Sequence, residues 1–403
     1  MQKMQDIRKC LWKKEIKLSV FQINMEKSAA RRLAIILLIS FTAFLLSTYT
    51  VHDVYQERTI KIYDEVRHTM EEIRHKKIDV PVKVVDMEWV LERWGSSTVS
   101  EEEAKKEEMF YKSLLIVPSN FSFKRKVDSE VAGFMAFYWK DAVYVVRENF
   151  DPYSNSGKEA LAHELEHAIQ DRYFTIKAGD THDGEKAYSA LIEGSAVIAG
   201  WLYVNKSIEK ELSKIENETE CKFEINRGFD DSLHLLYFFP YKFGTLYAGK
   251  MYLETGDLDN GYLNPPKSTK EILEGKKSFI KVVGNWDVEG YDLIRNDTLG
   301  EFFTYIFLST HLSDCEALES AKGWNGDNFK LFRLNNSFVF FWKICFETEK
   351  DADEFQNSIT QLLNTVGVKK GDYWETGLKG TINEIIKFKR NGREILIEGM
   401  GKI

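Results

Sequence analysis

Cysteine is scarce in this chain, which has four cysteines in 403 residues. Cys10 precedes the first long apolar segment, and Cys221, Cys315 and Cys345 are spread widely along the remainder. Three thiols permit at most one disulfide among themselves, and their spacing does not match that of a zinc ribbon. The sequence therefore excludes a fold that depends on a dense disulfide framework or on a cysteine-rich structural zinc site.

Basic residues are in the minority over most of the chain, which has a formal net charge of −8. Residues 1–32 have nine Lys and Arg against three Asp and Glu, whereas residues 33–403 have 46 basic against 60 acidic side chains. A nucleic-acid-binding protein is expected to present a basic domain or face. The acidic excess of the larger part argues against that class, and we expect no nucleic-acid partner.

Charged residues are absent from residues 33–51, LAIILLISFTAFLLSTYTV. Nineteen uncharged, mostly apolar residues at helical rise cross the hydrocarbon core of a bilayer, so the segment predicts a single transmembrane signal anchor. The Lys and Arg excess before it places the N-terminus in the cytoplasm and the larger part outside the cell membrane. A cleaved signal peptide is the alternative, with Met25 as a possible true start. The lack of a small-x-small cleavage site after Leu46 favours the anchor.

The remainder exceeds the size at which one hydrophobic core usually keeps growing, so two folded units are expected. Helical and strand patterns are mixed along it, and we predict an α+β fold class. The expected elements are a charged helix after the apolar segment, a hairpin at 132–147, helices near 158–173, 185–214 and 229–256, strands at 329–334 and 337–347, a helix at 351–367 and a closing hairpin around Asn391 and Gly392.

The segment ALAHELEHAIQD carries the pattern H-E-x-x-H. His163 and His167 are four residues apart, so on a helix they project from the same face and can bind one metal ion. Glu164 lies beside them, where it can reach a metal-bound water. Leu161 and Leu165 lie on roughly the opposite side and can seat the helix in a core. A surface helix with coincidental histidines is the alternative, and the apolar back of this helix argues against it.

A catalytic zinc ion generally has three protein ligands and one open position. The expected third ligand is Glu193, in the segment AYSALIEGSAVIAGW, where small residues permit close approach to the histidine helix. His182, Asp180 and Asp183 in the intervening loop are the alternatives. No cysteine lies between Cys10 and Cys221, which argues against a deformylase-like zinc site.

These features resemble the gluzincin metallopeptidases, the broad thermolysin-like group. More closely, the segments HELEHAIQDRYF, ALIEGSA, FFPYKFG, PPKST, GWNGDNF and DADEF resemble a set of largely uncharacterised exported or membrane-anchored archaeal and bacterial proteins. The resemblance implies that His163, His167 and Glu193 bind Zn²⁺ and that Glu164 is the general base. Thermolysin proper has an Asn before its ligand glutamate and an Asp one turn later.

In this chain Ile192 and Val197 occupy those two positions, so these positions supply no hydrogen-bond partner for the histidine nitrogens that face away from the metal. Gln170 and Asp171 are the candidates for that role. The expected domain organisation is a cytoplasmic tail at 1–32, the anchor at 33–51, a helical stalk or linker at 52–112, a zincin-like domain at 113–280 and a C-terminal α+β domain at 281–403.

The expected function is zinc-dependent hydrolysis of a peptide or protein substrate, with the protein acting as a membrane-anchored endopeptidase. We expect Tyr241, in FFPYKFG, to stabilise the tetrahedral oxyanion, with His234 and Tyr247 as reserves. The edge of the hairpin at 132–147 is expected to bind substrate as an added strand. The main alternative function is a non-catalytic, zincin-like extracellular binding module.

Overall fold

The computed structural model describes residues 54–175, 177–219, 227–277 and 279–403. The chain divides into two compact units, Met1–Lys61 and Ile62–Ile403. The described residues of the first unit are helical and belong to a helix over residues 54–74. The charged helix that was expected after the apolar segment is therefore present, and it ends seven residues before Pro81.

The predicted fold with a single N-terminal transmembrane helix needs correction. No helix in the described part of the chain is both long and apolar enough to cross a membrane. The expected span at 33–51 and the basic tail at 1–32 lie outside the described residues. The described residues accordingly form an α+β fold in which no helix spans a membrane, and the cell-membrane location stays a prediction.

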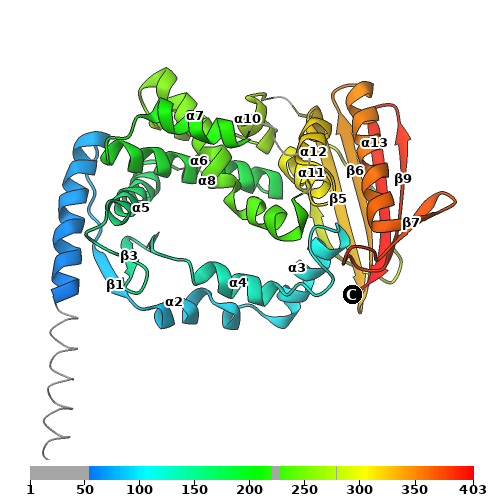
Figure 1. The fold of residues 1–403 in the computed structure, drawn as a ribbon, viewed down its shortest axis with the longest axis horizontal. Coiled ribbons are helices and arrows are strands. Elements are labelled where there is room, and N and C mark those ends of the chain that lie inside the picture. The colour runs from blue at the N-terminus through cyan, green and yellow to red at the C-terminus, as the bar shows by residue number, and fades with distance from the viewer. Residues whose placement is uncertain (1–53, 176, 220–226, 278) are drawn as a thin grey trace, which may run out of the picture. The chain divides into compact units, whose positions relative to one another are not determined.

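A small three-stranded sheet contains the predicted hairpin (Figure 1). Its strands are β1 (Val82–Val85), β2 (Ala136–Trp139) and β3 (Ala142–Val146), in the order β1-β3-β2. Lys140 and Asp141 connect β2 to β3 with φ of 45° and 57°, the conformation of a tight type I′ hairpin turn. Strand β1 pairs with β3 in parallel. A strand from the segment expected as stalk or linker thus completes this sheet, and β2 is its edge.

Three long helices follow this sheet in the chain, and the first of them, α5 (Asn155–Tyr173), contacts β2 and β3. Helix α5 begins after Ser154, whose side chain accepts a hydrogen bond from the Gly157 N–H. Helix α6 (His182–Tyr203) packs against both α5 and α8 (Gly228–Thr255). The expected helix at 185–214 is divided, because α6 ends at Tyr203 and α7 (Ile208–Thr219) follows.

Glycines determine how closely α6 approaches α8. A Cβ atom added at Gly194 would lie 2.1 Å from the backbone of Gly244, and one added at Gly244 would lie 2.1 Å from the carbonyl oxygen of Ala190. Only residues without a side chain permit this contact. The small residues of α6 were expected to allow contact with α5. Gly200 does so, since an added Cβ atom would lie 3.2 Å from the carbonyl oxygen of Glu159 in α5, but the closest approach is to α8.

Shorter helices connect these elements. They are α2 (Met87–Trp94), α3 (Glu101–Ser113), α4 (Phe123–Val131), α9 (Asp259–Leu263) and α10 (Thr269–Glu274). The side chain of Ser268 caps α10 by accepting a hydrogen bond from the Glu271 N–H. The segment Ser113–Val117 reads as a β-type run, but it forms the end of α3 and a buried turn, because its apolar side chains fill the core beneath the second sheet.

The second sheet is antiparallel and has the order β4-β5-β6-β10-β9-β8-β7. Its strands are β4 (Asp292–Asp297), β5 (Trp324–Leu334), β6 (Ser337–Phe346), β7 (Gly367–Lys370), β8 (Tyr373–Thr376), β9 (Glu384–Asn391) and β10 (Glu394–Lys402). Helices α11 (Gly300–Ser309) and α13 (Glu349–Val366) contact it, and α12 (Asp314–Ala321) lies between them in sequence (Figure 1). The closing hairpin around Asn391 and Gly392 is confirmed.

One apolar core joins this sheet to the helices before it. Phe239 of α8 stacks on Phe302 of α11 with ring centroids 3.9 Å apart, and both side chains are fully buried. The same core includes Ala190 of α6 and Trp342 of β6. The domain boundary expected at residue 280 therefore does not separate two cores, and Ile62–Ile403 forms one unit.

Candidate metal centre

Helix α5 presents two histidine rings from consecutive turns. The Nε2 atoms of His163 and His167 lie 3.1 Å apart, and the rings are nearly perpendicular. Leu161, Leu165 and Ile169 are fully buried and fix the rotation of the helix about its axis. The amphipathic pattern of α5 thus directs both imidazoles toward the same point in space.

Helix α6 supplies a carboxylate to the same point. The Oε2 atom of Glu193 lies 3.1 Å from Nε2 of His163 and 3.5 Å from Nε2 of His167. Among the described residues, these three form the one group of His, Cys, Asp or Glu side chains compact enough to hold a metal ion.

The alternative ligands lie elsewhere. The Asp183 carboxylate accepts hydrogen bonds from the backbone N–H and the hydroxyl of Thr269. The His182 ring packs edge-on against Phe303, and Asp180 is exposed. Of these three alternatives, His182 and Asp183 belong to the first turn of α6, and none of the three is part of the group formed by His163, His167 and Glu193.

The separations of the donor atoms are within about 0.2 Å of those expected around zinc. Nitrogen and oxygen ligands bound to Zn²⁺ at about 2.0–2.2 Å in a tetrahedron are separated from one another by about 3.3–3.5 Å. The three observed separations are 3.1, 3.1 and 3.5 Å. Two imidazoles and one carboxylate are also a usual donor set for catalytic zinc, with a fourth position left for water. The residues present therefore fit Zn²⁺.

The electrostatics of the cluster favour a cation. Burial opposes charge on the His167 ring, but the Glu193 carboxylate and other hydrogen-bonding partners raise its pKa to about 10. Burial likewise opposes charge on Glu193, but the His167 ring and the hydrogen bonds from both histidines hold the pKa of that carboxyl below its usual range. The raised pKa of His167 reports the negative potential of the carboxylates at that ring, and the lowered pKa of Glu193 reports the stabilisation of its charge by the two histidines.

Gln170 orients one of the ligands. Its Oε1 atom lies 2.8 Å from Nδ1 of His167, the ring nitrogen that faces away from Glu193. An outer-shell partner of this kind fixes the orientation of a metal-binding imidazole. Of the two candidates from the sequence, Gln170 occupies this position. Asp171 instead accepts a hydrogen bond from the Tyr138 hydroxyl at 2.8 Å.

Glu164 lies at the edge of the three donor side chains. Its residue is only 8% exposed, and its Oε2 atom accepts a hydrogen bond of 2.8 Å from the backbone N–H of Tyr138 in β2. The remaining carboxylate oxygen belongs to a side chain that lines the same cavity as His163 and His167. This position suits a group that receives a proton beside the metal.

The centre opens into a cavity of about 580 Å³ between β2, α5, α6 and α8. Its walls are rich in aromatic side chains, namely Phe134, Phe137, Tyr138, Trp139, Phe174, Tyr188 and Tyr241. Pockets of this size and character are typical of sites that bind a small molecule or a short segment of chain. The exposed edge of β2 runs along it.

Tyr241 of α8 enters the site, whereas its expected reserves do not. Its ring stacks near that of His163, with centroids 6.2 Å apart. Burial of the hydroxyl, together with the nearby Glu193 and Glu164 carboxylates, raises the pKa of Tyr241, so the phenol keeps its proton. His234 stacks on Phe238, and Tyr247 lines a different cavity. Of the three residues expected for this role, Tyr241 is therefore the one that lines this cavity.

Sequence reasoning did not anticipate two groups near the centre. The first is the Tyr138 backbone N–H, whose contact with Glu164 follows from the edge position of β2. The second is Tyr262, which lies next to Gln170 in space but 92 residues away in sequence. The hairpin pattern gave a signal for Tyr138. No spacing or periodicity in the sequence gave one for Tyr262.

Comparison with known proteins gives one match. A protein-family model described as a domain of unknown function (DUF8575) matches residues 289–399, which span the second sheet from β4 and helices α11 to α13. No curated protein and no solved structure matches the chain. The matched segment does not include His163, His167 or Glu193.

Proposed function

We propose that this protein is a zinc-dependent peptidase that hydrolyses peptide bonds. The observation that carries the proposal is the convergence of two imidazole nitrogens and one carboxylate oxygen, 3.1–3.5 Å apart, beside the buried carboxylate of Glu164. His163, His167 and Glu193 would hold the metal. Bound zinc supplies a Lewis acid that lowers the pKa of water and polarises a carbonyl group.

Glu164 acts as the general base. It takes a proton from the attacking water and passes it to the leaving amine of the cleaved bond. The hydrogen bond from the Tyr138 N–H orients one carboxylate oxygen and leaves the other directed to the reaction. This anchoring keeps Glu164 close to the donor atoms without making it a ligand.

Tyr241 and β2 bind the reacting peptide. The protonated hydroxyl of Tyr241 donates a hydrogen bond to the oxyanion that develops on the scissile carbonyl. The edge of β2 offers backbone groups along the cavity, and an extended peptide adds to such an edge as a further strand. Binding through backbone groups makes sequence preference modest.

The test is digestion of a peptide library by the full-length protein, with and without a zinc chelator. We expect cleavage that the chelator abolishes and that added Zn²⁺ restores. Glu164→Gln should abolish cleavage while the protein keeps its zinc. The matched control is Glu159→Gln, because Glu159 lies on the same helix but pairs with Lys206 at the surface.

The same experiment separates the enzyme from a binding module. A zinc-loaded wild-type protein that cleaves no peptide supports the non-catalytic module. Cleavage that persists in the Glu164→Gln variant contradicts the assignment of the base. Cleavage that is insensitive to the chelator contradicts a zinc mechanism altogether.

A further inference from the structure

We propose that Tyr262 and the buried Glu166–Arg74 ion pair are positioning residues that hold a proton on Nδ1 of His167 and so leave Nε2 to bind the metal. The inference rests on the proposed zinc site and deepens it. Four hydrogen bonds in series join Arg74 to His167, through Glu166, Tyr262 and Gln170. Followed in order from Arg74, each bond fixes the donor and acceptor of the next.

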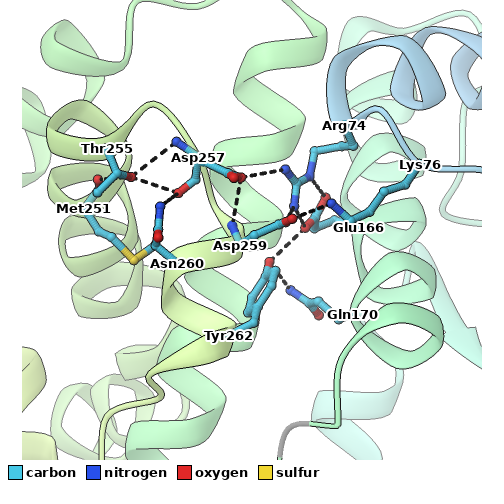
Figure 2. Close-up of polar contacts among 10 residues, drawn as sticks. All are labelled: Arg74, Lys76, Glu166, Gln170, Met251, Thr255, Asp257, Asp259, Asn260 and Tyr262. Atoms are coloured by element: carbon cyan, nitrogen blue, oxygen red, sulfur yellow. Dashed lines mark hydrogen bonds and ion pairs between the residues drawn. The ribbon is translucent and has the colours of Figure 1, made fainter.

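The ion pair forms the fixed end of this series (Figure 2). The Arg74 guanidinium donates to Glu166 from Nε at 2.7 Å and from Nη2 at 3.1 Å, and the Glu166 side chain is completely buried. Asp259 accepts a further hydrogen bond from Arg74 and also pairs with Lys76. An ionised carboxylate can only accept and a guanidinium can only donate, so Glu166 is an acceptor to all its partners.

The hydrogen bond from Tyr262 to Glu166 determines how Tyr262 can interact with Gln170. Its hydroxyl lies 2.8 Å from Oε1 of Glu166 and must donate there. Burial, and then the negative charge of Glu166, raise the pKa of Tyr262, so the hydroxyl retains the proton that it donates. With that proton committed, the Tyr262 oxygen serves as an acceptor toward Gln170, whose Nε2 atom lies 2.9 Å away.

Gln170 therefore has one allowed amide orientation. Its Nε2 group has two acceptors, the Tyr262 oxygen and the backbone carbonyl of Ile192, each at 2.9 Å. The amide oxygen must then face Nδ1 of His167, at 2.8 Å. Because that oxygen can only accept, Nδ1 carries a proton, and Nε2, which faces Glu193 and His163, is the nitrogen left to bind the metal.

Loss of Tyr262 weakens this constraint. Without its oxygen, the Gln170 amide keeps a single acceptor on its nitrogen side and can turn, so that its NH₂ group faces His167. That orientation requires an unprotonated Nδ1 and places the proton on Nε2, the atom that must bind the metal. Tyr262 thus contributes to metal affinity although it touches neither the cation nor any of its ligands.

The test measures zinc affinity by competition with a chromophoric chelator, using the full-length protein. Loss of an outer-shell partner reduces metal affinity by about 10–100-fold. We expect Tyr262→Phe to weaken binding about 10-fold, because the Ile192 carbonyl remains, and Gln170→Met to weaken it by about 100-fold. The matched control is Tyr173→Phe, because the Tyr173 hydroxyl donates to the Lys77 carbonyl outside this series. It should bind zinc as the wild type does.

A second measurement reports the tautomer independently of affinity. In the zinc-loaded wild type, ¹⁵N NMR should show a protonated Nδ1 on His167, and its proton signal should shift or broaden in Tyr262→Phe. Unchanged affinity together with an unchanged Nδ1 proton signal in a folded Tyr262→Phe variant overturns the inference alone. A wild-type protein that binds no zinc overturns the proposed function, and the inference with it.

Discussion

The backbone N–H of Tyr138 donates a hydrogen bond of 2.8 Å to the Glu164 carboxylate, and this contact ties the proposed base to the edge strand of the small sheet. The strand that would align a peptide therefore also holds the group that would move its proton. Substrate position and base position are coupled through one residue. A shift of β2 relative to α5 would disturb both.

The metal ligands are the first subject for mutation. His163→Ala and Glu193→Ala each remove one of three donor atoms, so we expect both variants to lose bound zinc and activity. Elemental analysis of the purified proteins checks this. The control is His68→Ala, because the His68 ring is largely exposed on the first described helix. A Glu193→Ala variant that still binds one equivalent of zinc would show that Glu193 is not a ligand.

Tyr241 should affect turnover more than binding. Replacing it with Phe removes the hydroxyl and keeps the ring that stacks near His163, so zinc content should be unchanged. Loss of one oxyanion donor costs about 10²–10³-fold in kcat. Steady-state kinetics on a cleaved peptide check this, with Tyr153→Phe as the control because Tyr153 is exposed and does not line the cavity. A raised KM with unchanged kcat would assign Tyr241 to substrate binding instead.

The Arg74–Glu166 pair should dominate the stability of its region. Arg74→Met leaves the Glu166 carboxylate buried without its cation, and breaking a buried pair in this way costs about 3–5 kcal/mol. Chemical denaturation should show that loss in the free energy of unfolding. Lys77→Met is the control, since Lys77 is 83% exposed and its pair with Glu71 contributes little. A small decrease in the free energy of unfolding of Arg74→Met would show that the hydrogen bond from Tyr262 is sufficient to stabilise the buried Glu166 carboxylate.

Glu384 should make stability depend on pH. Burial raises the pKa of this carboxyl, and neither of its oxygens has a hydrogen-bond partner among the described residues. A raised pKa in the folded state means that the protonated form is favoured by folding. Stability is therefore fully present below the unfolded pKa of about 4.3 and is lost as pH rises above it.

Glu384→Gln should accordingly raise the melting temperature at pH 8 and change it little at pH 4. Differential scanning calorimetry at both pH values measures this. The control is Glu375→Gln, because Glu375 is exposed on the neighbouring strand β8. Equal effects of Glu384→Gln at the two pH values would mean that ionisation of this group is not the cause.

Local patterns predicted the elements that form the centre. The four-residue spacing of His163 and His167, the apolar back of α5 and the β-branched and aromatic runs of β2 and β3 are all short-range signals, and each corresponds to the structure. The convergence of Glu193 with the histidines depended on helix contact, and the small residues around it were the available signal. Each of these signals involves residues that are close together in the sequence, so the geometry of a helix or strand directly determines their relative positions.

Contacts between distant segments were not predictable. Strand β1 pairs with β3 across about sixty residues, and Tyr262 meets Gln170 across 92, and neither contact has a periodic pattern. The orientation of Gln170 also depends on Arg74, which belongs to a helix expected as part of a stalk. These contacts are determined by the packing of the whole unit. The sequence alone is compatible with many other pairings of the same distant residues.

Anomalous diffraction from crystals of the zinc-loaded protein, measured at the zinc absorption edge, tests the central claim most directly. We expect one strong anomalous peak, within about 2.0–2.2 Å of Nε2 of His163, Nε2 of His167 and a carboxylate oxygen of Glu193. A crystal with stoichiometric zinc whose anomalous peak lies away from these three side chains would contradict it.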